Sequence, residues 1–145
     1  MLVHGTPYLT VSYDAALRRL ELCWSGEFTP SRCFRPLLDS IQQFIVNRRP
    51  TRWLCDHGAM RIISPEDQAW LFERWMPVLC AGWHEQPARV AVVKASDLFG
   101  LRSTLNVAQR LQQRRCLDVE LFDARGDAEQ WLLTGSHPPK GPEEC

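Results

Sequence analysis

The sequence has little that would suit a membrane, a nucleic acid or a bound phosphate. No apolar run approaches the ~18 residues that a membrane span needs, and the first residues lack the basic and apolar regions of a signal peptide. The formal net charge is 0, from 17 basic and 17 acidic residues, so the positive surface of a nucleic-acid-binding domain is not expected. No glycine-rich phosphate loop is present either. We expect a cytoplasmic protein that binds no nucleic acid and has no membrane span.

The cysteines and histidines do not form the short-range pairs that bind metals. The six cysteines lie far apart without any Cys-x-x-Cys pair, and the four histidines are also widely separated. Structural zinc sites need such pairs at short spacing. An even number of cysteines is only a weak sign of disulfides in a chain of this length. We therefore expect free thiols, and neither a metal nor another cofactor.

The length of 145 residues fits one domain with its own hydrophobic core. Beyond residue 134 the chain is rich in glycine and proline and has too few apolar residues to pack. We predict a single domain over residues 1–134 and a disordered tail over residues 135–145.

The periodicity of apolar residues predicts an α/β fold. Alternation from Tyr8 to Tyr13 and from Leu20 to Trp24 is typical of an antiparallel hairpin with one buried face. Strand and helix patterns then alternate. Strands are expected at 51–56, 89–95 and 118–123, and helices at about 30–48, 64–82, 101–115 and 126–133. The order β-β-α-β-α-β-α-β-α predicts a mixed five-stranded sheet with about four helices.

The helix that follows residue 63 has the clearest boundaries. Ser64 is placed as its N-cap, Pro65 fits the first helical position, and two acidic residues follow in the first turn. Pro77 predicts a kink, and Gly82 fits the end of the helix. Its N-terminus should lie near the carboxyl ends of the strands, where α/β proteins usually bind their ligands.

Two apolar loops predict a binding edge at these strand ends. If the strands at 51–56 and 89–95 are parallel neighbours, the loop with Met60 and Ile62 lies beside the loop formed by residues 97–100. The alternative is that these apolar side chains pack onto the helix ends as part of the core. Trp70 lies off the apolar stripe of its helix and is a further contact candidate. The candidate binding residues for a ligand or partner are Asp56, His57, Met60, Arg61, Ile62, Trp70 and Phe99.

The adjacent pair Asp56 and His57 could support general base catalysis. However, neighbouring residues in a strand point to opposite faces of the sheet, and no serine or cysteine nucleophile is placed beside them. Cys55 lies within a strand, where cysteine usually acts as a small apolar residue. We therefore predict that the protein is not an enzyme and assign no catalytic residue.

The order of these features resembles the SpoIIAA-like branch of the STAS domains, a group described together with the CRAL-TRIO lipid-transfer fold. The resemblance rests on four features: the N-terminal hairpin, the strand ending in Asp56 before Ile63-Ser64-Pro65-Glu66-Asp67, the helix with Trp70, Trp75-Met76-Pro77 and Gly82, and the closing Phe122-Asp123 followed by Ala128 and Trp131-Leu132. Together these features cover residues 8–133.

The resemblance implies a module without catalysis that binds another protein, or a nucleotide or lipid-like ligand. Relatives that antagonise anti-sigma factors are switched by phosphorylation of a serine after an aspartate at the end of the third strand. In this chain the matching Asp56-His57-Gly58 has no hydroxyl group, so the switch is not expected. The first hypothesis is a protein-interaction or regulatory module, with a second copy as one candidate partner. The alternative is a carrier or sensor of a small apolar ligand.

Overall fold

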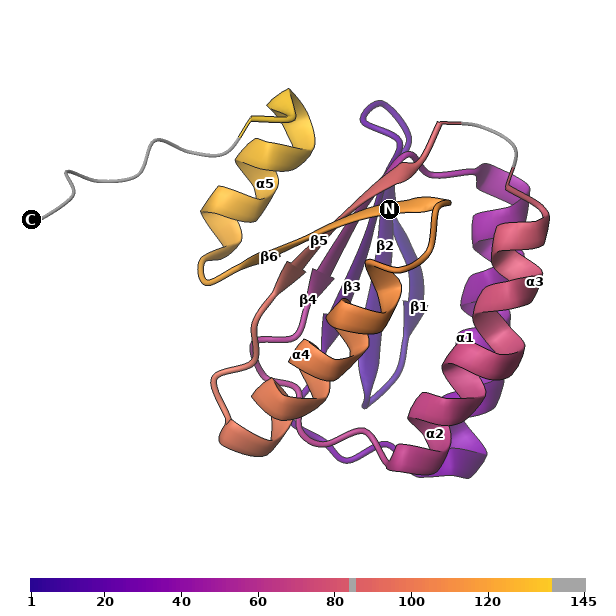
Figure 1. Ribbon diagram of the computed structural model, residues 1–145, viewed down its shortest axis with the longest axis vertical. Helices are drawn as coiled ribbons and strands as arrows, with labels where there is room; N and C mark the ends of the chain where they lie inside the picture. The colour runs from indigo at the N-terminus through magenta and orange to yellow at the C-terminus, as the bar shows by residue number, and fades with distance from the viewer. Residues whose placement is uncertain (84–85, 137–145) are drawn as a thin grey trace, which may run out of the picture.

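In the computed structural model, which describes residues 1–83 and 86–136, one mixed sheet forms the centre of the molecule (Figure 1). The spatial order of its six strands is the order along the chain. The first three strands pair antiparallel and the last three continue parallel to the third: β1 (Leu2–Gly5), β2 (Leu9–Asp14), β3 (Arg19–Trp24), β4 (Arg52–Asp56), β5 (Ala88–Val93) and β6 (Leu117–Phe122).

The predicted α/β class and mixed sheet are confirmed, but the prediction of five strands is wrong. The additional strand, β1, lies at the edge of the sheet and pairs only with β2. None of its residues is buried, and its register shifts between Leu2 and His4. Because its side chains do not alternate between core and solvent, the period of two that reveals a strand is missing from its sequence.

Four helices cover the sheet. They are α1 (Ser31–Arg48), a continuous second helix made of α2 (Pro65–Trp70), the π-helical η1 (Leu71–Trp75) and α3 (Met76–Ala81), then α4 (Leu98–Leu111) and α5 (Arg125–Thr134). The helices that connect parallel strands lie on one face, because such crossovers are right-handed and the strands follow in one direction. The last helix, α5, covers the other face over β4, β5 and β6 (Figure 1).

The second helix begins where the sequence predicts. The Ser64 hydroxyl accepts a hydrogen bond from the backbone N–H of Asp67 at 3.1 Å. The sequence predicts a kink at Pro77, and the structure has the π-helical turn η1 just before this proline. A proline ring clashes with the carbonyl four residues earlier, here that of Glu73, and the wider turn accommodates the ring.

The predicted loop over residues 97–100 is wrong, because α4 already begins at Leu98. Asp97 is its N-cap and accepts a hydrogen bond from the backbone N–H of Gly100 at 2.9 Å. Gly100 permits a close approach to the neighbouring loop, since a Cβ atom there would lie 2.0 Å from the carbonyl oxygen of Met60. The glycine that suggested a loop is therefore required by tertiary packing inside a helix.

Each face of the sheet has its own core. Alternate residues of β4 divide between them, with Trp53 and Cys55 facing the three crossover helices and Leu54 facing α5. The smaller core under α5 consists of Leu54, Ala91, Val93, Phe122, Ala128, Trp131 and Leu132. On the larger face, apolar side chains of α1, the second helix and α4 pack against β2 to β6.

Cys80 and Cys116 form a disulfide, so the prediction of free thiols is wrong for this pair. It joins the last turn of α3 to the residue before β6, and the Cα atoms lie 5.7 Å apart. The two cysteines are separated by 36 positions in the sequence, and only the folded chain brings them together. Cys23, Cys33 and Cys55 are free.

The end of the described chain follows α5 directly. Gly135 ends this helix with a positive φ of 71°, a conformation that glycine adopts without strain. The rest of the predicted tail, residues 137–145, lies outside the described residues. None of the described helices combines the length and the apolar composition that crossing a membrane needs.

Candidate functional site

The loops after β4 and β5 lie side by side at the carboxyl edge of the sheet. Ser96 joins them, because its hydroxyl donates to the carbonyl oxygen of Gly58 at 2.9 Å and its backbone N–H donates to the same oxygen at 3.2 Å. The backbone N–H of Ile63 donates to the hydroxyl of Ser103 in α4 at 3.1 Å. The two loops lie close together because β4 and β5 are paired in parallel.

Three of the candidate residues meet in an open cleft between these loops. Arg61, Ile62 and Phe99 line it, together with Gly26 from the loop before α1. Ile62 is 47% exposed and Phe99 is 63% exposed. The cleft thus combines two exposed apolar side chains with the cationic Arg61 and the anionic Asp97.

Met60 and Trp70 do not belong to this cleft. Met60 is 3% exposed and is part of the larger core. Trp70 is half-buried in the second helix, where its ring packs edge-on against Phe34 and lies under the guanidinium of Arg35. For Met60, the alternative of core packing describes the structure, whereas Trp70 packs half-buried against α1.

Asp56 and His57 point to opposite faces of the sheet, as strand geometry predicts. Asp56 accepts hydrogen bonds from the backbone N–H of Gly58 at 2.9 Å and from Arg125 of α5 at 3.3 Å. Arg125 also pairs with Glu21 of β3 and Glu129 of α5. The Asp56 carboxylate therefore ties α5 to the carboxyl edge.

His57 lies on the opposite face, between β4 and α4. Its Nδ1 atom is 3.0 Å from the hydroxyl oxygen of Thr104, and the side chain is 6% exposed. Burial lowers the pKa of His57 to about 4, and the nearby Asp56 carboxylate only partly opposes this shift. The ring is therefore neutral at pH 7.

Beneath the loop that follows β4, an apolar cavity of about 80 Å³ lies between the sheet and the crossover helices. Its floor consists of side chains from β3, β4 and β5, and its walls come from α1, the second helix and α4. Met60 and Ile63 close its upper end. The lining residues are Leu22, Trp24, Phe34, Leu38, Ile45, Trp53, Cys55, His57, Met60, Ile63, Leu71, Trp75, Met76, Val90, Val92, Val107 and Leu111.

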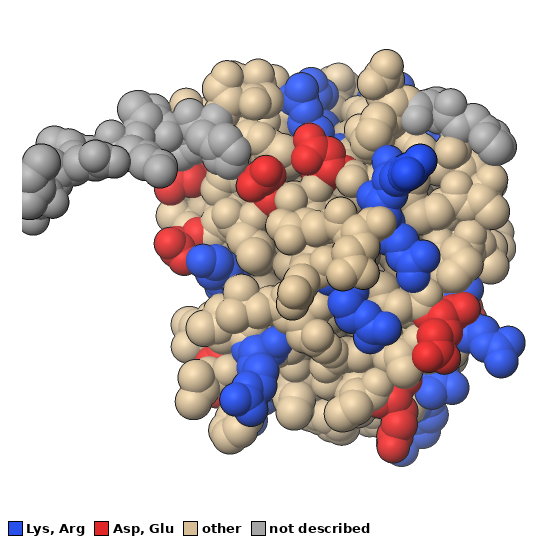
Figure 2. Space-filling view, viewed as in Figure 1, with Lys and Arg blue, Asp and Glu red and all other residues tan. Residues whose placement is uncertain are grey.

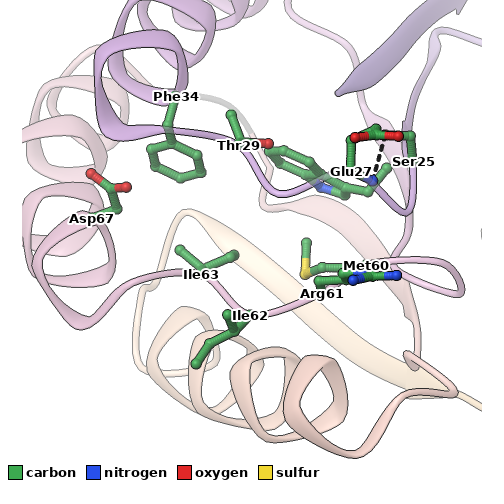
Figure 3. Close-up of a pocket in the computed structure, with 10 residues that line it drawn as sticks. Ser25, Glu27, Thr29, Phe34, Met60, Arg61, Ile62, Ile63 and Asp67 are labelled. Carbon is green, nitrogen blue, oxygen red and sulfur yellow. Dashed lines mark hydrogen bonds between the residues drawn. The ribbon is translucent and has the colours of Figure 1, made fainter. Parts of the chain in front are cut away.

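A small pocket at the carboxyl edge, called the mouth below, adjoins this cavity and shares lining residues with it. Trp24, Phe34, Met60 and Ile63 line both the mouth and the cavity. Figure 3 shows Phe34 of α1 and Ile63 of the loop facing one another, with Asp67 of α2 at the rim. The mouth has a volume of about 20 Å³, which is enough for about one water molecule.

The described residues provide no metal centre and no activated thiol at this edge. No group of three or more histidine, cysteine, aspartate or glutamate residues in the described part of the chain could hold a metal ion. Burial raises the pKa of the Cys55 thiol to about 12, whereas a nucleophilic cysteine needs a lowered pKa. Cys55 is an apolar component of the cavity lining.

Thr104 belongs to this candidate site but was not among the residues predicted from the sequence. It is fully buried in α4 and is the partner of His57. The sequence contains a sign of this role, because Thr104 lies between Leu101 and Val107 at helical spacing, on the side of the helix that faces the core. A hydroxyl in such a position requires a hydrogen-bond partner.

The charges near the site do not form a field of one sign. Figure 2 shows acidic and basic side chains interspersed on the side of the molecule that carries α4, with uncharged surface between them. In comparisons with known proteins, no family model, no curated protein and no solved structure matches this chain.

Proposed function

We propose that this protein is a carrier or sensor of a small apolar ligand, acts without catalysis, and binds the ligand in the cavity between the sheet and the crossover helices. One observation supports the proposal: the larger core contains an apolar space of about 80 Å³ instead of being filled. Protein interiors are packed as densely as organic crystals, and voids larger than a water molecule are few. An apolar void stays dry and accepts apolar molecules.

The position of the cavity suits a ligand site. Its mouth lies at the carboxyl edge of parallel strands, where ligands bind in open α/β sheets. The side chains that close it come from a loop and from the first turn of α1, which are easier to move than the middle of a helix.

Cyclopentane, an apolar molecule of about the right size, tests this proposal. In a titration followed by methyl NMR, we expect saturable shifts at Val90, Val92 and Val107, which line the cavity. Val107→Phe would fill much of the space and abolish the shifts. The matched control is Leu105→Phe, on the exposed side of the same helix, which should leave them unchanged. Shifts that do not saturate in the unmodified protein would contradict the proposal.

The second candidate is the STAS-like protein-interaction module, with self-association as its simplest form. It is supported by the apolar rim beside the mouth, where Ile62, Leu98 and Phe99 are exposed. Exposed apolar patches are frequent at interaction sites. Light scattering during size-exclusion chromatography should show a dimer that the double variant Ile62→Ser, Phe99→Ser converts to a monomer. A monomer at every concentration would exclude self-association.

A further inference from the structure

His57 is a buried polar side chain of the cavity whose hydrogen bonding is incomplete among the residues that the structure describes. Among the other buried lining residues, Trp53 donates its indole N–H to the carbonyl of Pro50 at 2.9 Å, and Trp75 donates to that of Leu38 at 2.7 Å. The Cys55 thiol is a weak donor. Nε2 of His57 has no hydrogen-bond partner among the residues that the structure describes.

Nε2 must therefore face open space. Every described side-chain nitrogen or oxygen that protein atoms enclose completely has a hydrogen-bond partner. Since Nε2 has none, it is not completely enclosed, although 94% of the His57 side chain is shielded from solvent, as its 6% exposure indicates. The space that this side chain borders is the apolar cavity.

The contact with Thr104 decides which ring nitrogen carries the proton. The single proton of the Thr104 hydroxyl has two acceptors within reach, Nδ1 of His57 at 3.0 Å and the sulfur of Met60 at 4.0 Å. A thioether sulfur is a weak acceptor, whereas a neutral imidazole nitrogen is a good one. The hydroxyl therefore donates to Nδ1. Because the ring is neutral, its single proton is then on Nε2, and an N–H donor faces the cavity.

We propose that the ligand is an uncharged apolar molecule with one hydrogen-bond acceptor, a carbonyl or ether oxygen, which accepts from Nε2–H of His57. This inference rests on the proposed function, because it names the class of ligand for the same cavity. A charged ligand would have to leave water for an apolar lining without a counter-charge. The space of about 80 Å³ lies between the ~15 Å³ that holds one water molecule and the ~150 Å³ of a cavity that binds benzene. Molecules with about five non-hydrogen atoms fit this range.

Two ring molecules of equal size separate the hydrogen bond from the cavity itself. Cyclopentane has no polar atom, and tetrahydrofuran replaces one methylene group with an ether oxygen. We expect both to bind the unmodified protein. In His57→Phe, we expect the affinity for tetrahydrofuran relative to cyclopentane to fall about fivefold, the effect of one net hydrogen bond. Thr104→Ser keeps the hydroxyl and should leave the ratio unchanged.

A measurement on the unmodified protein tests the proton position and does not depend on whether a variant folds. Long-range ¹H–¹⁵N NMR of the imidazole should show the proton on Nε2. Tetrahydrofuran should shift this resonance, and cyclopentane should shift it much less. A proton on Nδ1 would overturn the inference.

The outcomes distinguish the inference from the function on which it depends. If neither molecule binds, the proposed function is wrong. If both bind and His57→Phe does not change their ratio, the cavity binds apolar ligands but His57 does not select them, and the inference alone is wrong.

Discussion

The carboxyl and amino edges of the sheet differ in how their polar and apolar side chains are used. At the carboxyl edge, apolar side chains are exposed, an apolar cavity lies beneath them, and a buried histidine has a ring nitrogen without a hydrogen-bond partner among the described residues. At the amino edge, arginines donate to the ends of helices and a disulfide joins two elements. The comparison shows that the polar groups of the amino edge are used within the fold, whereas the carboxyl edge leaves a buried ring nitrogen without a partner among the described residues.

The arginines of the amino edge serve the fold. Arg18 donates to the carbonyl of Arg49 at the end of α1, and Arg49 donates to that of Gly82 at the end of α3. Arg52 donates to the carbonyls of Leu132 in α5, at 2.7 Å, and of Leu17, at 2.6 Å. Carbonyls at helix C-termini lack partners within the helix and carry partial negative charge, so guanidinium groups stabilise them. These three arginines therefore serve the ends of helices.

The largest expected effect comes from the disulfide at the amino edge. Replacing Cys80 and Cys116 with serine should lower the free energy of unfolding by about 4 kcal/mol, because the 36-residue separation sets the loop entropy of the unfolded chain. Urea unfolding measures it, with the free thiol Cys33→Ser as the control. Equal stability would mean that the bond is not formed in solution. Because disulfides are rare in reducing compartments, alkylation of thiols in intact cells also tests the predicted cytoplasmic location.

Gly100 tests whether the two loops of the carboxyl edge are as close as described. Gly100→Ala should cost about 3 kcal/mol, since its Cβ would lie 2.0 Å from the Met60 carbonyl oxygen and force the backbone apart. Gly126→Ala is the matched control in the first turn of α5, where a Cβ meets nothing within 4 Å. It should stabilise by about 0.5 to 1 kcal/mol. Thermal unfolding of both variants measures these changes in stability. If Gly100→Ala is as stable as the unmodified protein, the two loops are not as close as described.

His57 should make the carboxyl edge sensitive to acid. Its pKa is about 4 in the folded protein against 6.5 for the unperturbed group. Between these values the unfolded chain binds a proton that the folded protein does not, so stability falls as the pH drops from 6.5 toward 4. The full loss is about 3 kcal/mol. Denaturant unfolding at several pH values should show this loss of stability in the unmodified protein and not in His57→Phe. If the free energy of unfolding depends on pH in the same way in both proteins, His57 is not the cause.

Arg52 gives a smaller effect at the amino edge. Arg52→Ala removes both of its hydrogen bonds to backbone carbonyls and should cost about 2 kcal/mol. Arg102→Ala, which removes an exposed arginine of α4, should change stability by about 0.5 kcal/mol or less. Equal losses in the two variants, measured by urea unfolding, would show that the helix-end contacts do not distinguish these arginines.

The smallest effect is expected at the exposed rim. Phe99→Ser should change the free energy of unfolding by about 0.5 kcal/mol or less, because the side chain is 63% exposed. Differential scanning fluorimetry is sufficient to detect the difference. A loss of about 2 kcal/mol would instead assign Phe99 to the core and remove it from the candidate interaction surface.

Local signals in the sequence predicted much of this architecture. The cap at Ser64, the hairpin of β2 and β3 and the buried strand β5 follow from side-chain periodicity and from the hydroxyl that starts the second helix. The proximity of the loops after β4 and β5 followed from treating those strands as parallel neighbours. The start of α4 at Leu98 could not be predicted in this way. Gly100 fits a loop as well as a helix, and only its contact with the Met60 carbonyl shows why a glycine is needed there.

Residue order and local chemistry thus set the class of fold, most of its helices and strands, and the edge at which a site should be sought. The pairing of Cys80 with Cys116, the contact of His57 with Thr104 and the unfilled space beneath Met60 came from the folded chain. Each depends on groups far apart in sequence that meet only when the helices pack on the sheet. A periodic pattern identifies which side chains turn inward, but it contains no information about the partner that each will find there.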